Sequence, residues 1–262
     1  MAQPTLDDII ATKQEEVARR KESAPLSDII AATGDAPAPR DFAGALVASE
    51  DVALIAEVKR QSPSKGLLCP GFDPAATARE YAKAGASAIS CLTDEHYFGG
   101  RLEYVKVVHE SCDLPVLRKD FILDPYQVYE SRAAGADAVL LIAAVLPVDR
   151  LRELHELAES LGMAALVEVH NEAEAHSAVD AGAKIIGINN RNLQDFTVDT
   201  GTTARLRPII PEGVIVVSES GIRGPEDVRR LRQLGVDAML VGEHLMTASD
   251  RGAAVRSLTA GN

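Results

Sequence analysis

The fold is decided by the stretch AGADAV at residues 134–139, where a helix-like segment ends at a glycine and an apolar run follows. Similar stretches occur three more times, as AGASAI at 84–89, AGAKII at 181–186 and LGVDAM at 234–239. Glycine is favoured just past a helix end because it adopts the left-handed backbone there at little cost. The four glycines stand 50, 47 and 53 residues apart, about two strand–helix units each. The repeat therefore predicts an α/β chain of alternating strands and helices.

Further apolar runs bring the number of predicted strands to eight. Helices are predicted between them: residues 148–161 carry an apolar stripe of helical period, and Pro225 opens another helix ahead of acidic residues. Eight alternations in about 210 residues are typical of a TIM barrel. A doubly wound sheet is disfavoured because the sequence contains no GxGxxG motif. The strands are predicted near residues 53–58, 87–92, 115–119, 137–142, 163–168, 184–188, 214–218 and 237–241.

Residues 1–48 precede the first predicted strand and are expected to form a helical extension packed on the barrel. Within them, 7–21 is a plausible amphipathic helix, while 24–43 is interrupted by three prolines. No low-complexity linker divides the rest, so residues 49–262 are predicted to be one catalytic barrel domain. The apolar face expected to cover the barrel consists of Leu6, Ile9, Ile10 and Val17.

The composition, 46% hydrophobic and 25% charged among 262 residues, is typical of a soluble globular protein. A net charge of −12 argues against a nucleic acid or a membrane surface as partner, because both attract clustered Lys and Arg. Three cysteines without CxxC spacing indicate a reducing compartment. We see no secretory signal and no apolar stretch of membrane-spanning length. The expectation is a cytoplasmic protein, monomeric because no large apolar stripe is evident.

Charged side chains stand at or near the C-terminal ends of several apolar runs. A buried parallel strand is usually apolar throughout, so a charge at its end needs a reason. In a TIM barrel that reason is usually chemistry, because the active site is built on the C-terminal rim. Glu57 and Lys59 are two residues apart in a strand, so their side chains point to the same face. The residues at these ends are Glu57, Lys59, Lys119, Glu168 and Glu219.

Two of these groups are candidates for proton transfer. Lys119, if desolvated near other cations, is expected to have a lowered pKa and to serve as an acid or base. Its neighbours Arg118 and Asp120 leave the alternative of a solvated, alternately charged surface open. Glu168 closes an apolar strand, and a partly apolar pocket there is expected to raise its pKa.

The last three strands are followed by residues that suit an anionic ligand. Arg191 lies in the polar run at 189–192, where a guanidinium suits a carboxylate or phosphate and the asparagines could be turn residues only. Ser220-Gly221 and Gly242 follow the seventh and eighth strands, the recurrent phosphate site of this architecture. The histidines and cysteines lack metal-ligand spacing, so neither a metal nor a cofactor is expected.

With these residues assembled, the whole chain resembles the indole-3-glycerol-phosphate synthase family of tryptophan biosynthesis. The resemblance implies a carboxy-lyase, which closes the indole ring of 1-(2-carboxyphenylamino)-1-deoxyribulose 5-phosphate and releases CO2 and water. It also allows association with other enzymes of the pathway. The motifs that carry the resemblance are EVK at 57–59 with SPSKG at 62–66, YFGG at 97–100, KDF at 119–121, LVEVH at 166–170, INNRNL at 188–193 and SESGI at 218–222.

The resemblance also implies a role for each strand-end residue. Lys119 is expected to be the general acid that protonates the ketone oxygen as the ring closes. Glu168 is expected to transfer a proton in the dehydration step, while Asn189 helps to hold the reacting group. Lys59 is expected to contact the substrate carboxylate, and Glu57 to position that lysine.

The remaining candidates are expected to bind substrate. Position 243 departs from the family, in which a small hydroxylic residue also occurs there. The backbone N–H of Glu243 can still serve the phosphate, but its side chain is expected to point away. The expected substrate-binding residues are Ser62 at the first loop, Phe98, Phe121 and Leu140 around the anthranilate ring, Arg191 and Glu219 as polar contacts, and Ser220, Gly221, Gly242 and Glu243 at the phosphate.

Two alternatives belong to other classes of function. A phosphoribosylanthranilate isomerase resembles this architecture but pairs a cysteine on the first strand with an aspartate on the sixth, where this chain has Glu57/Lys59 and Asn189. A non-catalytic phosphate-binding barrel is the other. It would keep the glycines of the last two loops but would have no need for ionisable groups at the first, third and fifth strands.

Overall fold

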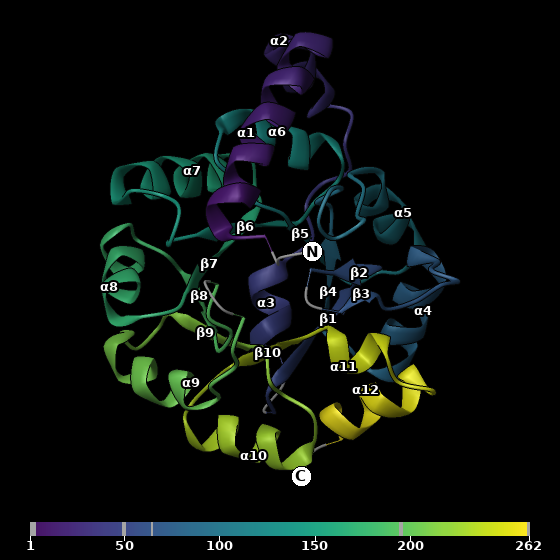
Figure 1. Cartoon of the computed structure of the whole chain (residues 1–262), viewed down its shortest axis with the longest axis vertical. Helices are drawn as coiled ribbons and strands as arrows, with labels where there is room; N and C mark the ends of the chain where they lie inside the picture. The colour runs from purple at the N-terminus through teal and green to yellow at the C-terminus, as the bar shows by residue number, and fades with distance from the viewer. Residues whose placement is uncertain (1–3, 49–50, 64, 194–195, 261–262) are drawn as a thin grey trace.

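The structure, a computed structural model, describes residues 4–48, 51–63, 65–193 and 196–260. Parallel strands close into a barrel in the order β1-β10-β9-β8-β7-β6-β5-β4, with helices around it (Figure 1). The predicted TIM barrel is confirmed, and each of its strands begins and ends within one residue of its predicted position. The strands are β1 (Ala53–Val58), β4 (Ala88–Leu92), β5 (Val116–Lys119), β6 (Ala138–Ile142), β7 (Ala164–Val169), β8 (Ile185–Asn189), β9 (Ile215–Glu219) and β10 (Ala238–Val241).

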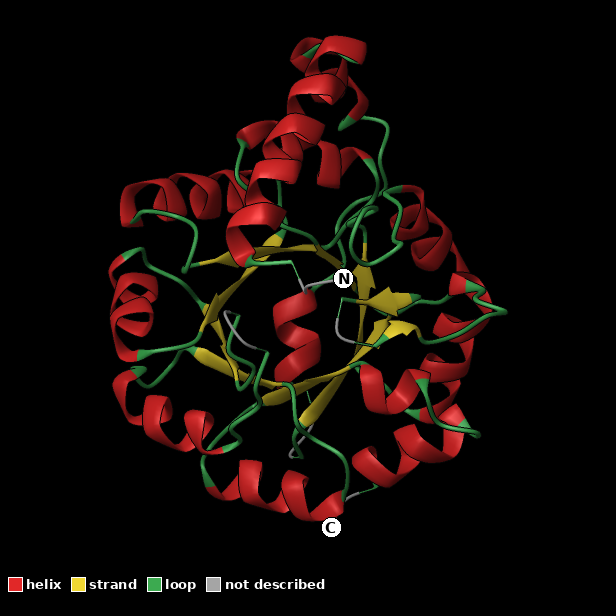
Figure 2. Cartoon of the chain, in the orientation of Figure 1, coloured by secondary structure: helices red, strands yellow, loops and turns green. Residues whose placement is uncertain are grey.

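Helices form the outer layer (Figure 2). Three of them begin with a proline, whose missing N–H costs nothing in the first helical turn. The predicted helices over 148–161 and from Pro225 are confirmed. The layer consists of α4 (Pro74–Ala84), α5 (Glu103–Ser111), α6 (Pro125–Ala133), α7 (Val148–Ser160), α8 (Glu172–Asp180), α9 (Gly201–Leu206) with the 3-10 turn η1 (Arg207–Ile209), α10 (Pro225–Gln233), α11 (Glu243–Met246) and α12 (Arg251–Thr259).

Alternation along each strand separates two apolar clusters. In β1, Leu54, Ala56 and Val58 belong to the cluster between strands and helices, whereas Ala53 and Ile55 belong to the one inside the barrel. Because side chains alternate with a period of two, Glu57 continues the inward row of Ile55. The strand thus delivers a carboxylate to the inside of the barrel at its C-terminal end. After β1, the chain forms a small hairpin of β2 (Gln61–Ser62) and β3 (Gly66–Leu67).

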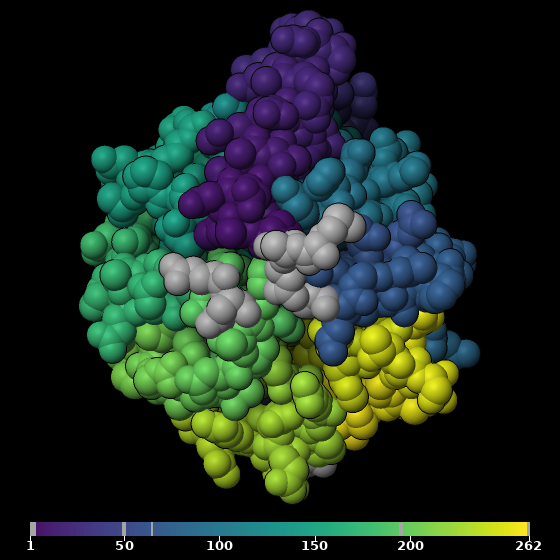
Figure 3. All heavy atoms as spheres, viewed as in Figure 1, coloured from purple at the N-terminus to yellow at the C-terminus, as the bar shows by residue number. Residues whose placement is uncertain are grey.

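Three helices precede β1: α1 (Leu6–Ser23), α2 (Leu26–Ala32) and α3 (Phe42–Val47). Figure 3 shows the first part of the chain as a projection at one edge of the molecule. There α2 packs on α6, while Phe42 and Leu46 of α3 join the apolar cluster inside the barrel. The helical extension is therefore present, and its treatment as a separate domain stays a prediction.

The predicted apolar face of α1 faces the protein. Ile9 and Val17 are buried, and Leu6 and Ile10 pack half-buried against the cluster inside the barrel. Among the residues described, no helix combines the length and the hydrophobicity needed to span a bilayer.

Candidate active site

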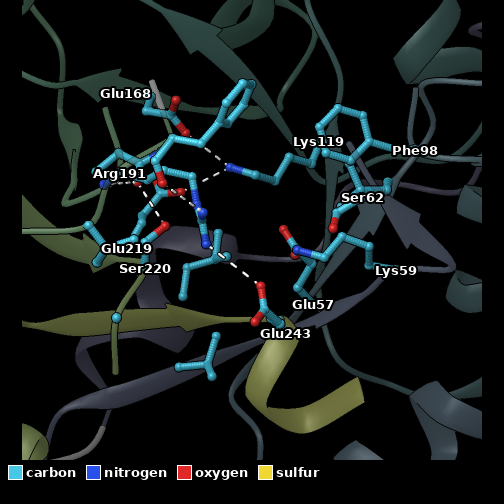
Figure 4. Close-up of a pocket in the computed structure, with 18 of the residues that line it drawn as sticks. Glu57, Lys59, Ser62, Phe98, Lys119, Glu168, Arg191, Glu219, Ser220 and Glu243 are labelled. Carbon is cyan, nitrogen blue, oxygen red and sulfur yellow. Dashed lines mark hydrogen bonds and ion pairs between the residues drawn. The ribbon is translucent and has the colours of Figure 1, made fainter. Parts of the chain in front are cut away.

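A pocket of about 440 Å³ lies at the C-terminal ends of the barrel strands, a volume typical of small-molecule sites. Figure 4 shows charged side chains of several strands pointing into it. The pocket brings together all fifteen residues predicted from the sequence, and their individual roles stay predictions. They are Glu57, Lys59, Ser62, Phe98, Lys119, Phe121, Leu140, Glu168, Asn189, Arg191, Glu219, Ser220, Gly221, Gly242 and Glu243.

Lys119 at the end of β5 lies between two buried carboxylates. Its Nζ donates to Oε2 of Glu168 at 3.0 Å and to Oε2 of Glu219 at 2.9 Å (Figure 4). The carboxylates come from the ends of β7 and β9, so three strands of the barrel meet in one ion-paired group. Charged hydrogen bonds of this kind are strong where water is excluded, and they fix the direction of the ammonium group.

The predicted directions of two pKa shifts are wrong. Burial alone would lower the pKa of Lys119, but the carboxylates of Glu168 and Glu219 outweigh it and raise that pKa above its ordinary value. Burial alone would raise the pKa of Glu168, but Lys119 and His170 hold it well below its usual range. The sequence suggested cations around Lys119, whereas the fold surrounds it with carboxylates. At neutral pH the pair is therefore an ammonium and a carboxylate.

Glu219 is the carboxyl group of this cluster whose pKa is raised. Burial and the neighbouring Glu168 raise its pKa to about 7, against the opposing effect of Lys119. Its Oε1 has no hydrogen-bond partner among the residues described. Glu168 has a second cationic neighbour in His170, whereas Glu219 shares Lys119 with Glu168. A buried carboxylate with less compensation costs more, which explains why the pKa is raised at Glu219 and lowered at Glu168.

His170 is a site residue whose part the sequence did not reveal. Its Nε2 lies 3.2 Å from Oε1 of Glu168, and its Nδ1 lies 2.9 Å from Oε2 of Glu174 in the first turn of α8. Although burial opposes it, these carboxylates raise the pKa of His170 to about 10. The sequence assigned His170 no role beyond its place in the LVEVH motif at 166–170, because its contacts with Glu168 and Glu174 are set by the turn after β7.

Glu57 and Lys59 form a second ion pair across the pocket, between Oε1 of Glu57 and Nζ of Lys59. Gly242 makes room for it, because a Cβ at this position would lie 2.0 Å from Oε1 of Glu57. The glycine after β10 therefore has a second reason to be there, beside the predicted approach to phosphate. Ser62 of β2 lies nearby on the pocket wall, and its Oγ accepts a hydrogen bond of 3.3 Å from the N–H of Lys65.

The loops after β8 and β9 are joined by Asn189. Its Oδ1 accepts from the N–H of Arg191 at 3.0 Å and from Oγ of Ser220 at 2.9 Å. Ser220 has a φ of 67° and Gly221 a φ of 83°, both in the left-handed region. Glycine adopts this conformation without strain, whereas a serine there is held by its surroundings.

Asn190 is a second residue whose part was missed. It is buried, its Nδ2 donates to the carbonyl oxygen of Ser220 at 3.0 Å, and its Oδ1 accepts from the N–H of Thr203 at 3.1 Å. These bonds hold the strained turn after β9 against α9. The sequence offered Asn190 only as a turn residue, since its partners lie 13 and 30 residues away.

Glu243 does not point away from the pocket, as the sequence predicts. One carboxylate oxygen lies 3.7 Å from Nη2 of Arg191 (Figure 4). The other lies 3.9 Å from Nζ of Lys65. Opposite charges at the pocket mouth attract the side chain inward. Arg191 also donates from Nη1 to the carbonyl oxygen of Phe196 at 3.1 Å.

The apolar wall contains the three predicted residues and several others. The rings of Phe98 and Phe121 lie 6.3 Å apart and tilted by 41°, and Leu140 of β6 is buried beside the pocket. The additional apolar lining residues resemble ordinary core residues in the sequence, so no local signal distinguished them. They include Leu92, Ile142, Leu193, Phe196, Val198, Ile222 and Leu240.

In the described part of the chain, no group of three or more His, Cys, Asp or Glu side chains has an arrangement suited to a metal ion. That the site works without a metal or cofactor stays a prediction.

Comparisons with known proteins point in one direction. A family model described as "Indole-3-glycerol phosphate synthase" matches residues 6–258. A protein of that description from Dehalococcoides mccartyi is 50% identical over 256 residues, covering 97% of this chain and 99% of the relative. Another, from Roseiflexus sp., is 51% identical and covers 98% of both chains. A third, from Laribacter hongkongensis, is 47% identical and covers 97% and 98%.

Solved structures at lower identity share the fold. A thiamine phosphate pyrophosphorylase from Pyrococcus furiosus has a TM-score of 0.61 at 21% identity, covering 80% of this chain and 94% of that one. KGPDC from Streptococcus mutans has a TM-score of 0.63 at 14% identity, covering 80% and 97%. These likenesses support the barrel alone.

Proposed function

This chain belongs to the indole-3-glycerol phosphate synthase family, and we propose that the pocket at the end of its barrel performs the family's reaction through Lys119 and Glu168. The enzyme is a carboxy-lyase that converts 1-(2-carboxyphenylamino)-1-deoxyribulose 5-phosphate into indole-3-glycerol phosphate, CO2 and water. Full-length similarity to these relatives excludes the two alternatives, the isomerase and the non-catalytic barrel.

Lys119 acts as the general acid of ring closure. When the ring carbon that bears the carboxylate attacks the ketone carbon, the ketone oxygen gains charge and takes a proton from the Lys119 ammonium. The raised pKa of Lys119 keeps that proton available at neutral pH, and its two carboxylate partners fix its direction. Loss of CO2 then returns the electrons of the broken bond to the ring.

Glu168 acts in the dehydration that follows. The new hydroxyl leaves as water with a proton from the Lys119 ammonium, which solvent has restored after ring closure, while the substrate loses a proton to Glu168 as the indole double bond forms. The lowered pKa of Glu168 keeps it an ionised acceptor for such a proton, and its 3.0 Å contact with Lys119 joins the two proton-transfer groups. Asn189 holds the reacting group beside them.

The other predicted residues divide the pocket into two ends. Lys59, held by Glu57, takes the substrate carboxylate, while Phe98, Phe121 and Leu140 enclose the anthranilate ring. The phosphate lies against the backbone of the loops after β9 and β10, with Arg191 and Glu219 as further polar contacts. We further propose that the chain acts in the cytoplasm, as a monomer that can associate with other tryptophan-pathway enzymes. The residues at the phosphate end are Ser220, Gly221, Gly242 and Glu243.

The observation that carries this proposal is the ion-paired group of Lys119, Glu168 and Glu219 inside one pocket with the Glu57–Lys59 pair. The test adds the carboxyphenylamino substrate to the purified protein and follows indole absorbance and fluorescence. The chain contains no tryptophan, so the product's fluorescence stands out from that of the protein. We expect stoichiometric conversion. A folded protein that produces no indole compound would contradict the proposal.

A further inference from the structure

A lysine of the N-terminal extension is buried beneath the active-site loops. The side chain of Lys13 in α1 is 1% exposed. Its Nζ lies 2.8 Å from Oδ1 of Asp120, 3.0 Å from Oδ2 of Asp94 and 2.8 Å from Oε2 of Glu16. Lys13 does not line the pocket. Burying an ammonium group is costly unless carboxylates compensate it, so this arrangement calls for an explanation beyond helix packing.

The two barrel carboxylates that Lys13 joins each hold the backbone of an aromatic wall residue. Oδ1 of Asp94 accepts from the N–H of Tyr97 at 2.8 Å and of Phe98 at 3.2 Å. Oδ1 of Asp120 accepts from the N–H of Phe121 at 2.8 Å. Asp120 also follows Lys119 directly in the chain. The contacts of one ammonium therefore reach both phenylalanines of the wall and the residue next to the general acid.

Asp94 depends on Lys13 more than Asp120 does. Asp120 has a second cation in Arg118, whose Nη2 lies 3.0 Å from Oδ2, and a hydrogen bond of 2.6 Å from Thr93. Among the described residues, Lys13 is the only cationic side chain within ion-pair distance of Asp94. Asp94 is 1% exposed. Without Lys13, its buried charge would lose this compensation, and the turn that carries Phe98 would lose its charged tie to the turn that carries Phe121.

The geometry points to Lys13 as a positioning residue of the active site, which ties the loops after β4 and β5 so that Phe98, Phe121 and Lys119 face the substrate together. This inference rests on the proposed function. It assigns a helix outside the barrel a part in the geometry of ring closure. The pocket's phosphate end, at Ser220, lies away from Phe98 in Figure 4 and should be little affected.

A matched control lies on the same helix. Lys21 also ties α1 to the barrel, through a 2.8 Å ion pair with Asp124 at the start of α6, and it is more exposed. If the ion pairs of α1 merely attach the helix, Lys13→Met and Lys21→Met should both lower stability and both leave kcat unchanged. If Lys13 positions the site, Lys13→Met alone should lower kcat.

The test measures kcat and KM for the carboxyphenylamino substrate, the Ki of inorganic phosphate and the thermal midpoint of both variants. For Lys13→Met we expect kcat to fall about 10- to 100-fold, the effect of a misplacement of about 1 Å or less, while the phosphate Ki stays within about twofold. For Lys21→Met we expect kcat within about twofold of the wild type. A Lys13→Met protein with wild-type kcat, or an equal loss in both variants, would overturn the inference.

A second variant keeps the test decisive if Lys13→Met folds poorly. Lys13→Met/Asp94→Asn removes the uncompensated charge, and the Asn oxygen can still accept from the N–H of Phe98. We expect this protein to regain stability while its kcat stays at least about tenfold low, because the tie to Asp120 is still missing. A kcat near the wild-type value would refute the inference. Failure of the proposed function would appear differently, as a wild-type protein without turnover.

Discussion

Loss of Lys119 should remove the acid catalyst from the pocket. The ammonium is the proposed proton donor to the ketone, so Lys119→Ala should lower kcat by about 10²- to 10⁴-fold, the usual effect of losing an acid catalyst. Substrate affinity should stay within about tenfold, because other residues are proposed to bind the carboxylate, ring and phosphate of the substrate. Initial rates of indole formation measure both. Lys106→Ala, which removes an exposed lysine of α5, is the control. Wild-type turnover in Lys119→Ala would exclude the assigned role.

Glu219 should make stability depend on pH. Its pKa is raised from 4.5 to about 7 in the folded protein, so the folded state binds this proton more tightly than the unfolded state does. The stability that the proton contributes is present below pH 4.5 and is lost as the pH rises toward and past 7. Glutamine resembles the protonated carboxyl group, so the Glu219→Gln protein should not lose this stability as the pH rises. Relative to the wild type, the variant should therefore be more stable at pH 8 than at pH 5.

Chemical denaturation of both proteins at pH 5 and pH 8 gives this difference in the free energy of unfolding. Other groups titrate in the same window, His170 among them, and subtracting the wild type from the variant largely removes their contribution. Glu156→Gln is the control, since it removes an exposed carboxylate of α7. A difference between variant and wild type that is constant or reversed with pH would show that Glu219 does not hold the extra proton.

Glu243 places a negative charge beside the proposed phosphate end. Glu243→Ser should lower both KM and the Ki of inorganic phosphate about fivefold, because a like charge at about 4 Å costs roughly 1 kcal/mol in water. The substitution also frees Arg191 from its 3.7 Å contact with this carboxylate. Steady-state kinetics at low ionic strength provides the measurement, and Glu156→Ser, with the same change in net charge, provides the control. Unchanged or raised constants would place the phosphate elsewhere.

At the scale of elements, the register between neighbouring strands determines which residues lie beside the charged groups. The register of β1 and β10 pairs Ala56 with Val241, which places Gly242 next to Glu57. Gly242→Ala would bring a Cβ to 2.0 Å from the carboxylate and force it away from Lys59. We expect kcat to fall about 10- to 100-fold as the ion pair is displaced. Gly71→Ala, where a Cβ would meet open space, should leave kcat unchanged, and equal effects of the two would refute the argument.

Element boundaries were predictable because each strand is a short apolar run that follows a glycine or ends at a charged residue. Both signals are local: the glycine relieves the backbone at the helix end, and a charge is disfavoured in the middle of a buried strand. Glu168 shows that the charge marks the strand end only to within about a residue, since β7 runs one residue past it to Val169. The placement of strand ends on one rim then follows from the barrel, which is why the predicted residues converge on one pocket.

At the scale of the whole molecule, the sequence failed where a contact joins distant segments. Arg118 and Asp120 suggested a solvated surface, yet both are buried, because Glu130 and Lys13 reach them from α6 and α1. The pKa shifts of Lys119 and Glu168 were wrong for the same reason, since their signs depend on partners 49 and 100 residues away. Charge balance inside a fold is a property of the assembled chain, and local pattern does not determine it.

The surface of the whole molecule predicts a monomer. Stable interfaces between copies need a contiguous apolar patch, but the large hydrophobic side chains exposed in the described residues are scattered over several elements. The net charge of −12 adds repulsion between copies. Light scattering should therefore give 27.9 kDa at every protein concentration. A mass near twice that value would contradict the prediction, and loss of that dimer in Leu26→Ser/Ile30→Ser would locate its interface on α2. The exposed side chains are Leu26, Ile30, Val47, Leu67, Val107 and Val198.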